Sequence, residues 1–270
     1  MAGCGELLGE TEMAEIEWRK LRADQLRERA AGDAIVIVPI ASLEQHGPHL
    51  PVEVDTLLGE TIAARAAEKI AARARPVVVL PVLWTGLSEH HMSFGGTITL
   101  DNAAFAAVVE GVVRSVQRHG FRKIVLLNAH GGNENALRAI TDDLTPKLRL
   151  PIVQFTYWYA AAVAIAKILE KQGGLTHACE AETSMMMAAR PELVAHDRIP
   201  REPSNTEGDL ASGVYRWRSI ASRTASGAMG HPEAASAEKG ERLFDAISTA
   251  IADKLCDNAL WDLPWESEEP

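Results

Sequence analysis

Residues 34–51 read AIVIVPIASLEQHGPHLP, an apolar run followed directly by polar residues. The first part, residues 34–40, is short, continuous and rich in β-branched side chains, and it follows the turn-forming pair Gly32-Asp33. A run of this kind is typical of a strand that is buried on both faces, as in the parallel sheets of α/β proteins. We therefore expect a central sheet with helices packed on both of its sides.

Other segments of the chain repeat this pattern of strand and helix. Similar apolar runs occupy residues 76–83, 123–128 and 151–156. Helical patterns occupy residues 15–30, 55–75, 103–119, 133–147, 159–171, 180–190 and 236–256. Strands that alternate with helices predict a three-layer α/β/α fold with a mostly parallel central sheet. Residues 198–232, rich in Pro, Gly, Ser and Arg, are expected to form loops and a short hairpin.

The length and composition limit the classes of protein to consider. With 270 residues, 47% of them hydrophobic and 24% charged, the usage is that of a globular protein. We expect one domain over residues 15–270, preceded by a flexible leader over residues 1–14. The net charge of −10 disfavours binding to nucleic acid or to an anionic membrane surface.

Cysteine usage and hydropathy favour a cytoplasmic protein. The three cysteines (Cys4, Cys179 and Cys256) lie far apart and form no CxxC motif, which argues against a disulfide framework. The N-terminal residues lack the pattern of a secretory signal. No run of 18 apolar residues is present, so no membrane-spanning segment is expected.

A candidate metal-binding cluster follows the first strand. Glu44 and His46 lie two residues apart, so they point to the same side of an extended segment. A carboxylate beside an imidazole suits zinc, manganese or iron. After the Gly47-Pro48 turn, Asp55 can fold back over the pair, and its two oxygens can bridge two cations. Each residue alone has an ordinary structural reading, and for Asp55 that reading is the N-cap of the helix from 55 to 75.

A second cluster, Asn128-Ala129-His130-Gly131-Gly132-Asn133, follows the strand over 123–128. The carboxyl ends of parallel strands meet at one edge of a sheet, and ligands bind outside that edge. We therefore expect His130 to lie near Glu44 and His46 as a metal ligand. Gly131 allows the backbone to approach a substrate. Alternatively the turn binds a phosphate, although it lacks the G-x-G-x-x-G spacing and the Walker lysine.

The third cluster covers residues 176–184. Thr176 is a candidate helix cap, and His177 then lies at the helix start, where the helix dipole lowers the pKa of an imidazole. Glu182, in the first turns, can reach a cation. A nucleophilic role for Cys179 is disfavoured, because neighbouring acids raise the pKa of a thiol.

Two further side chains are candidates for contact with substrate. His91 lies in the loop SEHHMSFGGT, residues 88–97, where adjacent histidines can line a pocket. Trp158, with Tyr157 and Trp217 as alternatives, can cover a flat substrate ring. Simple packing is the competing interpretation for all of these residues.

The motifs over residues 44–55, 128–133 and 177–184, with the loop 91–97 and the pattern over 230–240, resemble those of the creatininase (creatinine amidohydrolase) family. The resemblance spans about residues 33 to 250. It implies a creatininase-like fold, two divalent metal ions (Zn²⁺, Mn²⁺ or Fe²⁺) and a homohexamer built as a trimer of dimers.

The resemblance also implies a role for each matching residue. Glu44 and His130 would hold one metal ion, His46 would hold the other, and Asp55 would bridge both. His177 matches the histidine that carries a proton in the family. One departure is the position of Gly132, where creatininase has a glutamate, and Glu182 is the candidate to supply that ligand.

These features predict a metal-dependent amidohydrolase that acts on a small-molecule substrate. A metal-bridging hydroxide would hydrolyse a non-peptide C–N bond of a small cyclic amide or formamide, with His177 carrying the proton to the leaving nitrogen. A creatininase-family peptidase or deformylase in a biosynthetic pathway is an alternative. Two other classes stay open: a nucleotide-binding module built on Gly131-Gly132, and a non-catalytic scaffold that needs its metal only for folding.

Overall fold

The computed structural model describes residues 15–201 and 216–262. The predicted leader, residues 1–14, lies outside this range. Four parallel strands form the central sheet in the order β2-β1-β3-β4. The strands are β1 (Ile35–Ile40), β2 (Val77–Val79), β3 (Lys123–Asn128) and β4 (Ile152–Thr156).

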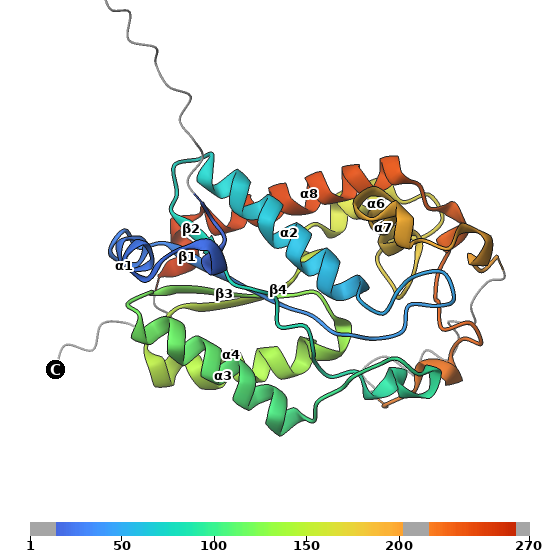
Figure 1. The fold of residues 1–270 in the computed structure, drawn as a ribbon, viewed down its shortest axis with the longest axis horizontal. Helices are drawn as coiled ribbons and strands as arrows, with labels where there is room; N and C mark the ends of the chain where they lie inside the picture. The colour runs from blue at the N-terminus through green and yellow to red at the C-terminus, as the bar shows by residue number, and fades with distance from the viewer. Residues whose placement is uncertain (1–14, 202–215, 263–270) are drawn as a thin grey trace, which may run out of the picture.

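Helices cover both faces of the sheet, as the pattern predicted (Figure 1). One face carries α2 (Val54–Ala71), α6 (Ala162–Ile168), α7 (Glu180–Ala189) and α8 (Ala237–Leu255). The other face carries α3 (Asn102–Arg118) and α4 (Glu134–Leu148). The architecture is therefore a three-layer α/β/α sandwich.

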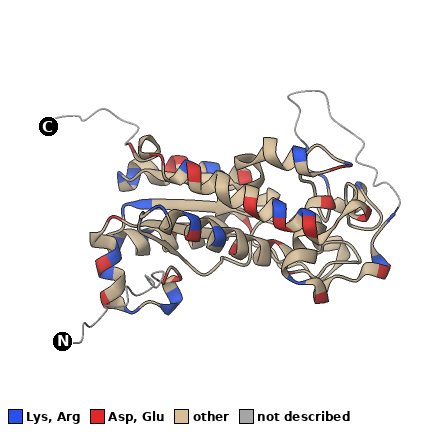
Figure 2. Ribbon diagram, turned by 90° about the horizontal axis from the view of Figure 1, so that it is seen from above, with Lys and Arg blue, Asp and Glu red and all other residues tan. Residues whose placement is uncertain are grey.

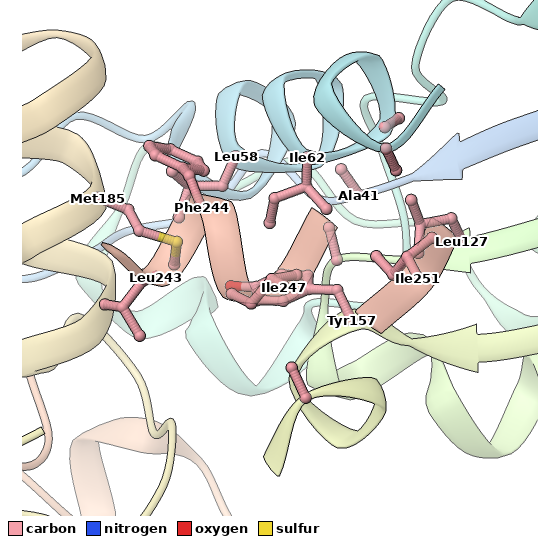
Figure 3. Close-up of a cluster of buried hydrophobic side chains, with 14 of the residues drawn as sticks. Ala41, Leu58, Ile62, Leu127, Tyr157, Met185, Leu243, Phe244, Ile247 and Ile251 are labelled. Carbon is pink, nitrogen blue, oxygen red and sulfur yellow. The ribbon is translucent and has the colours of Figure 1, made fainter. Parts of the chain in front are cut away.

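Each inner strand supplies side chains to two separate cores. Ile37 and Val125 pack on the side of α2 and α8, whereas Val38 and Leu126 pack on the side of α3 and α4. Figure 3 shows the first core, in which side chains of α2 and α8 meet Leu127 above the sheet. Burial on both faces explains why the strands are continuous apolar runs.

The outer surfaces of the helices carry charges of both signs, interspersed along the chain (Figure 2). Two ion pairs join α2 to α8, Arg65–Glu241 and Lys69–Asp245, and a third, Arg73–Asp253, joins the turn after α2 to α8, all at 2.6–2.7 Å. The backbones of α7 and α8 approach closely at Gly240, where a Cβ would collide with the carbonyl of Ser184. Among the described residues, no helix is both long and apolar enough to cross a bilayer.

The structure corrects two predicted elements near the sheet edge. The strand predicted over 76–83 is only three residues long. The Leu80 N–H still donates to the Ile37 carbonyl, but Pro39 of β1 has no N–H to donate back, so the regular ladder stops there. The helix predicted over 15–30 is shortened to α1 (Ala23–Ala31). Before it, the Ile16 carbonyl accepts a hydrogen bond from Val79 N–H, so residues 16 and 17 lie along β2 instead of entering a helix.

Two further predictions about irregular segments are also wrong in detail. The helix expected over 159–171 is split into α5 (Tyr157–Ala160) and α6, because Ala161 has a non-helical backbone (φ −124°). The hairpin expected within 198–232 is absent from the described part of that region, where 3₁₀ turns over Ile220–Ser222 and Pro232–Ala234 occur instead. Residues 202–215 lie outside the described residues.

Candidate metal centre

Strand register brings the first two motifs together at one edge of the sheet. Ile40, the last residue of β1, pairs with Asn128, the last residue of β3, so the segments that follow them leave the sheet side by side. Asn128 then fixes His130: its amide donates to the His130 carbonyl and accepts from the His130 N–H. The first turns of α2 and α7 face the same place and contribute Asp55 and Glu182.

Five metal-binding candidates converge there, and all are buried. Their exposed fractions are 1% for Glu44, 1% for His46, 3% for Asp55, 3% for His130 and 3% for Glu182. Burying three carboxylates in one place is costly unless positive charge or hydrogen bonds compensate them.

Among the described residues, three groups of side chains could hold a metal ion, and one of them is Glu44, His46 and His177. The other two groups share Asp55, and the first of these sets is Glu44, Asp55 and His130. His130 Nδ1 lies 3.2 Å from Glu44 Oε2 and 3.1 Å from Asp55 Oδ2. The other ring nitrogen, Nε2, lies 3.1 Å from the carbonyl oxygen of Leu87, which can only accept. The ring hydrogen therefore belongs on Nε2, and Nδ1 presents a lone pair to the two carboxylates.

The second set is His46, Asp55 and Glu182. His46 Nε2 lies 3.1 Å from Asp55 Oδ1 and 3.9 Å from Glu182 Oε2. His46 Nδ1 lies 3.0 Å from the backbone carbonyl of Glu44 and donates to it, so Nε2 carries the lone pair. Asp55 thus directs one carboxylate oxygen at each histidine and belongs to both sets.

The donor atoms fit divalent cations by chemistry and by spacing. Within each set the atoms lie within 4.8 Å of one another. Ligands about 2.1 Å from a tetrahedral zinc ion stand roughly 3.4 Å apart, which is close to the distances above. Among the described residues, His46 Nε2 and Asp55 Oδ2 are buried without a hydrogen-bond partner. A cation in each set would satisfy these atoms, one beside His46 Nε2 and the other beside Asp55 Oδ2.

The pKa values of His46, His130 and Glu182 are raised, which means that the carboxylates of the cluster favour bound positive charge. Burial lowers the pKa of His46, but Asp55 and Glu182 outweigh burial and raise it to about 9. The pKa of His130 also lies well above its usual range, because Glu44 and Asp55 overcome burial. Burial raises the pKa of Glu182 to about 8 despite the nearby His46. Without metal, protons therefore supply the charge that two cations would supply.

Comparison with known proteins agrees with this geometry. The family model described as creatinine amidohydrolase matches residues 19–255. The chain belongs to the creatininase family. A creatinine amidohydrolase from Pseudomonas putida is 31% identical, with 90% of this chain and 95% of that protein covered. A mycofactocin precursor peptide peptidase from Mycolicibacterium smegmatis is also 31% identical, with 82% and 84% covered.

Solved creatininase structures share the fold of this family member. A manganese form of creatininase superposes with a TM-score of 0.78 at 29% identity and covers 89% of this chain and 97% of its own. A mutant creatininase of Zn-Zn type superposes with a TM-score of 0.77 at 29% identity, with the same coverage. The three-layer fold predicted from the sequence is therefore confirmed.

The remaining candidates of this creatininase-family chain lie at different distances from the cluster. His91 is inside it, 2% exposed, with Nε2 3.1 Å from Glu44 Oε1. His177 is also inside, with Nδ1 3.6 Å from the same oxygen and its ring 4.3 Å from that of His46. Gly131 is next to His130, and a Cβ added to it would meet no described atom within 4 Å. Trp158 packs beside Tyr157 and Tyr159 and partly against the core, so its contact with substrate stays a prediction.

Two predicted helix caps are wrong, and both corrections concern the site. Asp55 does not cap α2: the helix begins one residue earlier, which leaves the carboxylate free to face the histidines. Thr176 does not cap α7, which begins at Glu180, and its hydroxyl donates to the Met229 carbonyl. The lowered pKa of His177 therefore comes from burial and from the nearby His46, and not from a helix start.

Sequence reasoning missed two residues of the site. The Ser88 hydroxyl donates to Glu44 Oε2 at 2.6 Å and lies 3.1 Å from His130 Nε2. Gln45 contacts both His91 and His177. A serine in a loop, 44 residues from its partner, gives no signal in a single sequence. Gln45 at least stands between two residues that the motif had already singled out.

Proposed function

We propose that this creatininase-family chain is a metal-dependent hydrolase of C–N bonds other than peptide bonds, with a small cyclic amide or formamide as substrate. The observation that carries the proposal is the division of the Asp55 carboxylate between two sets of ligands. One oxygen faces His130 and the other faces His46, each at 3.1 Å. A carboxylate shared in this way is the bridge that a two-cation site requires.

Glu44 and His130 would hold one cation, His46 and Glu182 the other, with Asp55 on both. Position 132 cannot supply a ligand here, because a Cβ on Gly132 would collide with the Leu87 carbonyl and with His130. Glu182 would supply it instead, with Oε2 3.9 Å from His46 Nε2. When bound, divalent cations lower the pKa of water toward neutrality and polarise a carbonyl oxygen.

His177 is the proton-carrying residue of the proposal. Hydrolysis adds the hydroxyl of water to the carbonyl carbon and its other hydrogen to the leaving nitrogen. The His177 side chain is 11% exposed, which makes it the most exposed of the histidines around Glu44. Its Nδ1 is the ring nitrogen that faces Glu44. We assign it the delivery of a hydrogen from Nδ1, with the proton released from water returning to the ring. Proton transfer by a positioned side chain contributes about 10²–10⁴ in rate. His91, Gly131 and Trp158 are the proposed contacts to substrate.

A nucleotide-binding role for the Gly131-Gly132 turn is not favoured. The Cα of Gly132 is packed against Leu87 and His90, so a phosphate cannot approach it from that side. The helix that follows begins with Glu134, an acid that repels an anion at that end. A peptidase or deformylase activity uses the same metal-binding groups, so these activities belong in the substrate screen.

The assembly and location are also part of the proposal. We infer a cytoplasmic homohexamer, a trimer of dimers, by extension from the resemblance and from the cysteine usage. Light scattering on the purified full-length chain tests the hexamer, because a monomer or dimer at working concentration would contradict it.

The activity is tested by a screen with cyclic amides such as creatinine, formamides and short peptides. The purified chain is assayed as isolated, after chelation, and after addition of Zn²⁺ or Mn²⁺. We expect hydrolysis of a cyclic amide or formamide that chelation abolishes and metal restores. Hydrolysis unaffected by full removal of metal would contradict the proposal, as would metal-loaded protein that hydrolyses none of the three classes.

A further inference from the structure

Gln45 is buried among the histidines of the site, with 6% of its surface exposed. Two backbone groups fix the orientation of its amide. The Gly47 N–H donates to Oε1 at 2.9 Å, and Nε2 donates to the Gly227 carbonyl at 3.1 Å. An N–H can only donate and a carbonyl can only accept, so exchanging the amide oxygen and nitrogen would break both bonds.

The same amide nitrogen also contacts two imidazoles. Gln45 Nε2 lies 2.9 Å from His91 Nδ1 and 3.0 Å from His177 Nε2. An amide nitrogen carries two hydrogens and does not accept hydrogen bonds. A hydrogen on either imidazole nitrogen would therefore point at a group that cannot accept it. Both nitrogens favour a lone pair, and each ring then carries its hydrogen on the opposite nitrogen.

Those opposite nitrogens face one acceptor. His91 Nε2 lies 3.1 Å from Glu44 Oε1, and His177 Nδ1 lies 3.6 Å from the same oxygen. The contact of His91 is within hydrogen-bond distance, whereas the contact of His177 at 3.6 Å is only electrostatic. For His91, both sides of the ring therefore agree on where the hydrogen belongs, and for His177 the Gln45 amide is the group that decides it.

Gly227 makes room for the Gln45 amide. Its backbone has φ +83°, a conformation that favours glycine, and a Cβ there would collide with Gln45 Oε1. The segment around Gly227 also holds the loop of His177, because the Met229 N–H donates to the His177 carbonyl at 2.7 Å.

We propose that Gln45 is a positioning residue that sets the tautomers of His91 and His177. One amide hydrogen stays on the Gly227 carbonyl, and the other is shared by the two rings. His177 consequently keeps its hydrogen on Nδ1, the nitrogen that faces the metal-binding side chains. The tautomers do not depend on any substrate; their effect on turnover rests on the proposed function.

The tautomers are measured by ¹H–¹⁵N correlation spectra of zinc-loaded, ¹⁵N-histidine-labelled protein, with signals assigned through His91→Gln and His177→Gln. We expect the hydrogen on Nδ1 of His177 and on Nε2 of His91. In Gln45→Met at least one ring should change tautomer or become a mixture. Gly227→Ala, which displaces the amide without removing it, should give the same change and serves if Gln45→Met does not fold.

Gln117→Met is the matched control, because the Gln117 amide donates to the Leu148 carbonyl on the far side of the sheet. It should leave both tautomers as in the wild type. With a substrate in hand, Gln45→Met should lower kcat about tenfold or more with little change in KM. A wild-type His177 with its hydrogen on Nε2, or unchanged tautomers in the Gln45 and Gly227 variants, would overturn the inference. Absence of any hydrolysis would instead refute the proposed function and leave the tautomer result standing.

Discussion

Asp55 Oδ1 lies 3.1 Å from His46 Nε2, and both side chains are buried. The hydrogen of His46 is on its other nitrogen, where it is donated to the Glu44 carbonyl. In the neutral ring two electron-rich atoms therefore face each other at close range, and the contact needs positive charge between them. A proton supplies that charge in the metal-free protein, where the pKa of His46 is about 9, and a bound cation would replace it. The same reasoning applies to Asp55 Oδ2 and His130 Nδ1.

Replacing Glu182 by glutamine should remove one of the two cations. The His46 set then keeps a single carboxylate, Asp55, whereas the Glu44–His130 set is unchanged. We expect the metal content of purified protein to fall from about two ions per chain to about one, measured by elemental analysis. Glu192→Gln, at an exposed position near the end of α7, is the matched control and should keep two. Two tightly held ions in Glu182→Gln would show that Glu182 is not a ligand.

Gly132→Ala should weaken metal binding through His130. The added Cβ would collide with the Leu87 carbonyl and His130 Nε2, two groups whose contact orients the ring. Loss of such a supporting contact typically costs 10–100-fold in metal affinity. Competition with a chelator of known affinity measures the change. At Gly131 a Cβ meets no described atom within 4 Å, so Gly131→Ala should bind metal like the wild type. Equal affinities for the two variants would contradict the role given to this contact.

Metal-free protein should become less stable as pH rises from about 6.5 to 9. Burial lowers the pKa of His46, but Asp55 outweighs it, and the pKa rises from 6.5 to about 9 in the folded state. Burial likewise raises the pKa of Glu182 to about 8. Over this window the folded state binds more protons than the unfolded state, so stability is lost as pH increases.

The measurement for this prediction is the Tm of chelator-treated protein at pH 6.5 and pH 9. We expect a decrease of several degrees, since one pKa unit corresponds to about 1.4 kcal/mol. Zinc-loaded protein should show a smaller decrease, because the cations have already displaced those protons. An unchanged Tm in the metal-free protein would contradict the assigned protonation.

Lys239→Ala should destabilise the fold by about 3–5 kcal/mol. Lys239 Nζ lies 2.7 Å from Glu180 Oε1, and the Glu180 carboxylate also accepts from the N–H groups of Glu170 and Lys171. Without the lysine, a buried charge remains unpaired at the start of α7. Urea unfolding measures the loss. Lys147→Ala, which breaks an exposed pair with Asp143, should cost about 1 kcal/mol or less. Equal costs for the two variants would contradict the argument.

The fold was largely predictable because both faces of the sheet are covered. Strands buried on both sides are continuous apolar runs, so β1 and β3 are evident in the sequence. The errors arose where a backbone property overrides composition. Pro39 of β1 has no N–H to continue the ladder with the second strand, and Ala161 divides an alanine-rich segment whose composition gives no sign of a break.

The site was predictable where residue spacing fixes direction. Glu44 and His46 were expected on one side of an extended segment, and both do face Asp55 and its neighbours. The same alternation rule places Gln45 on the opposite side. The positive φ of Gly47 (68°) bends the chain, and the Gln45 amide turns back to the Gly47 N–H. A turn of this kind cannot be derived from alternation, so Gln45 was missed.

The metal content of Asp55→Ala shows whether this carboxylate bridges two cations. Asp143→Ala, at an exposed position on α4, is the control for loss of an aspartate. We expect about two divalent ions per chain in the wild type and in the control, and close to none in Asp55→Ala, together with loss of hydrolysis. An Asp55→Ala protein that keeps both ions and its activity would show that Asp55 does not bridge them.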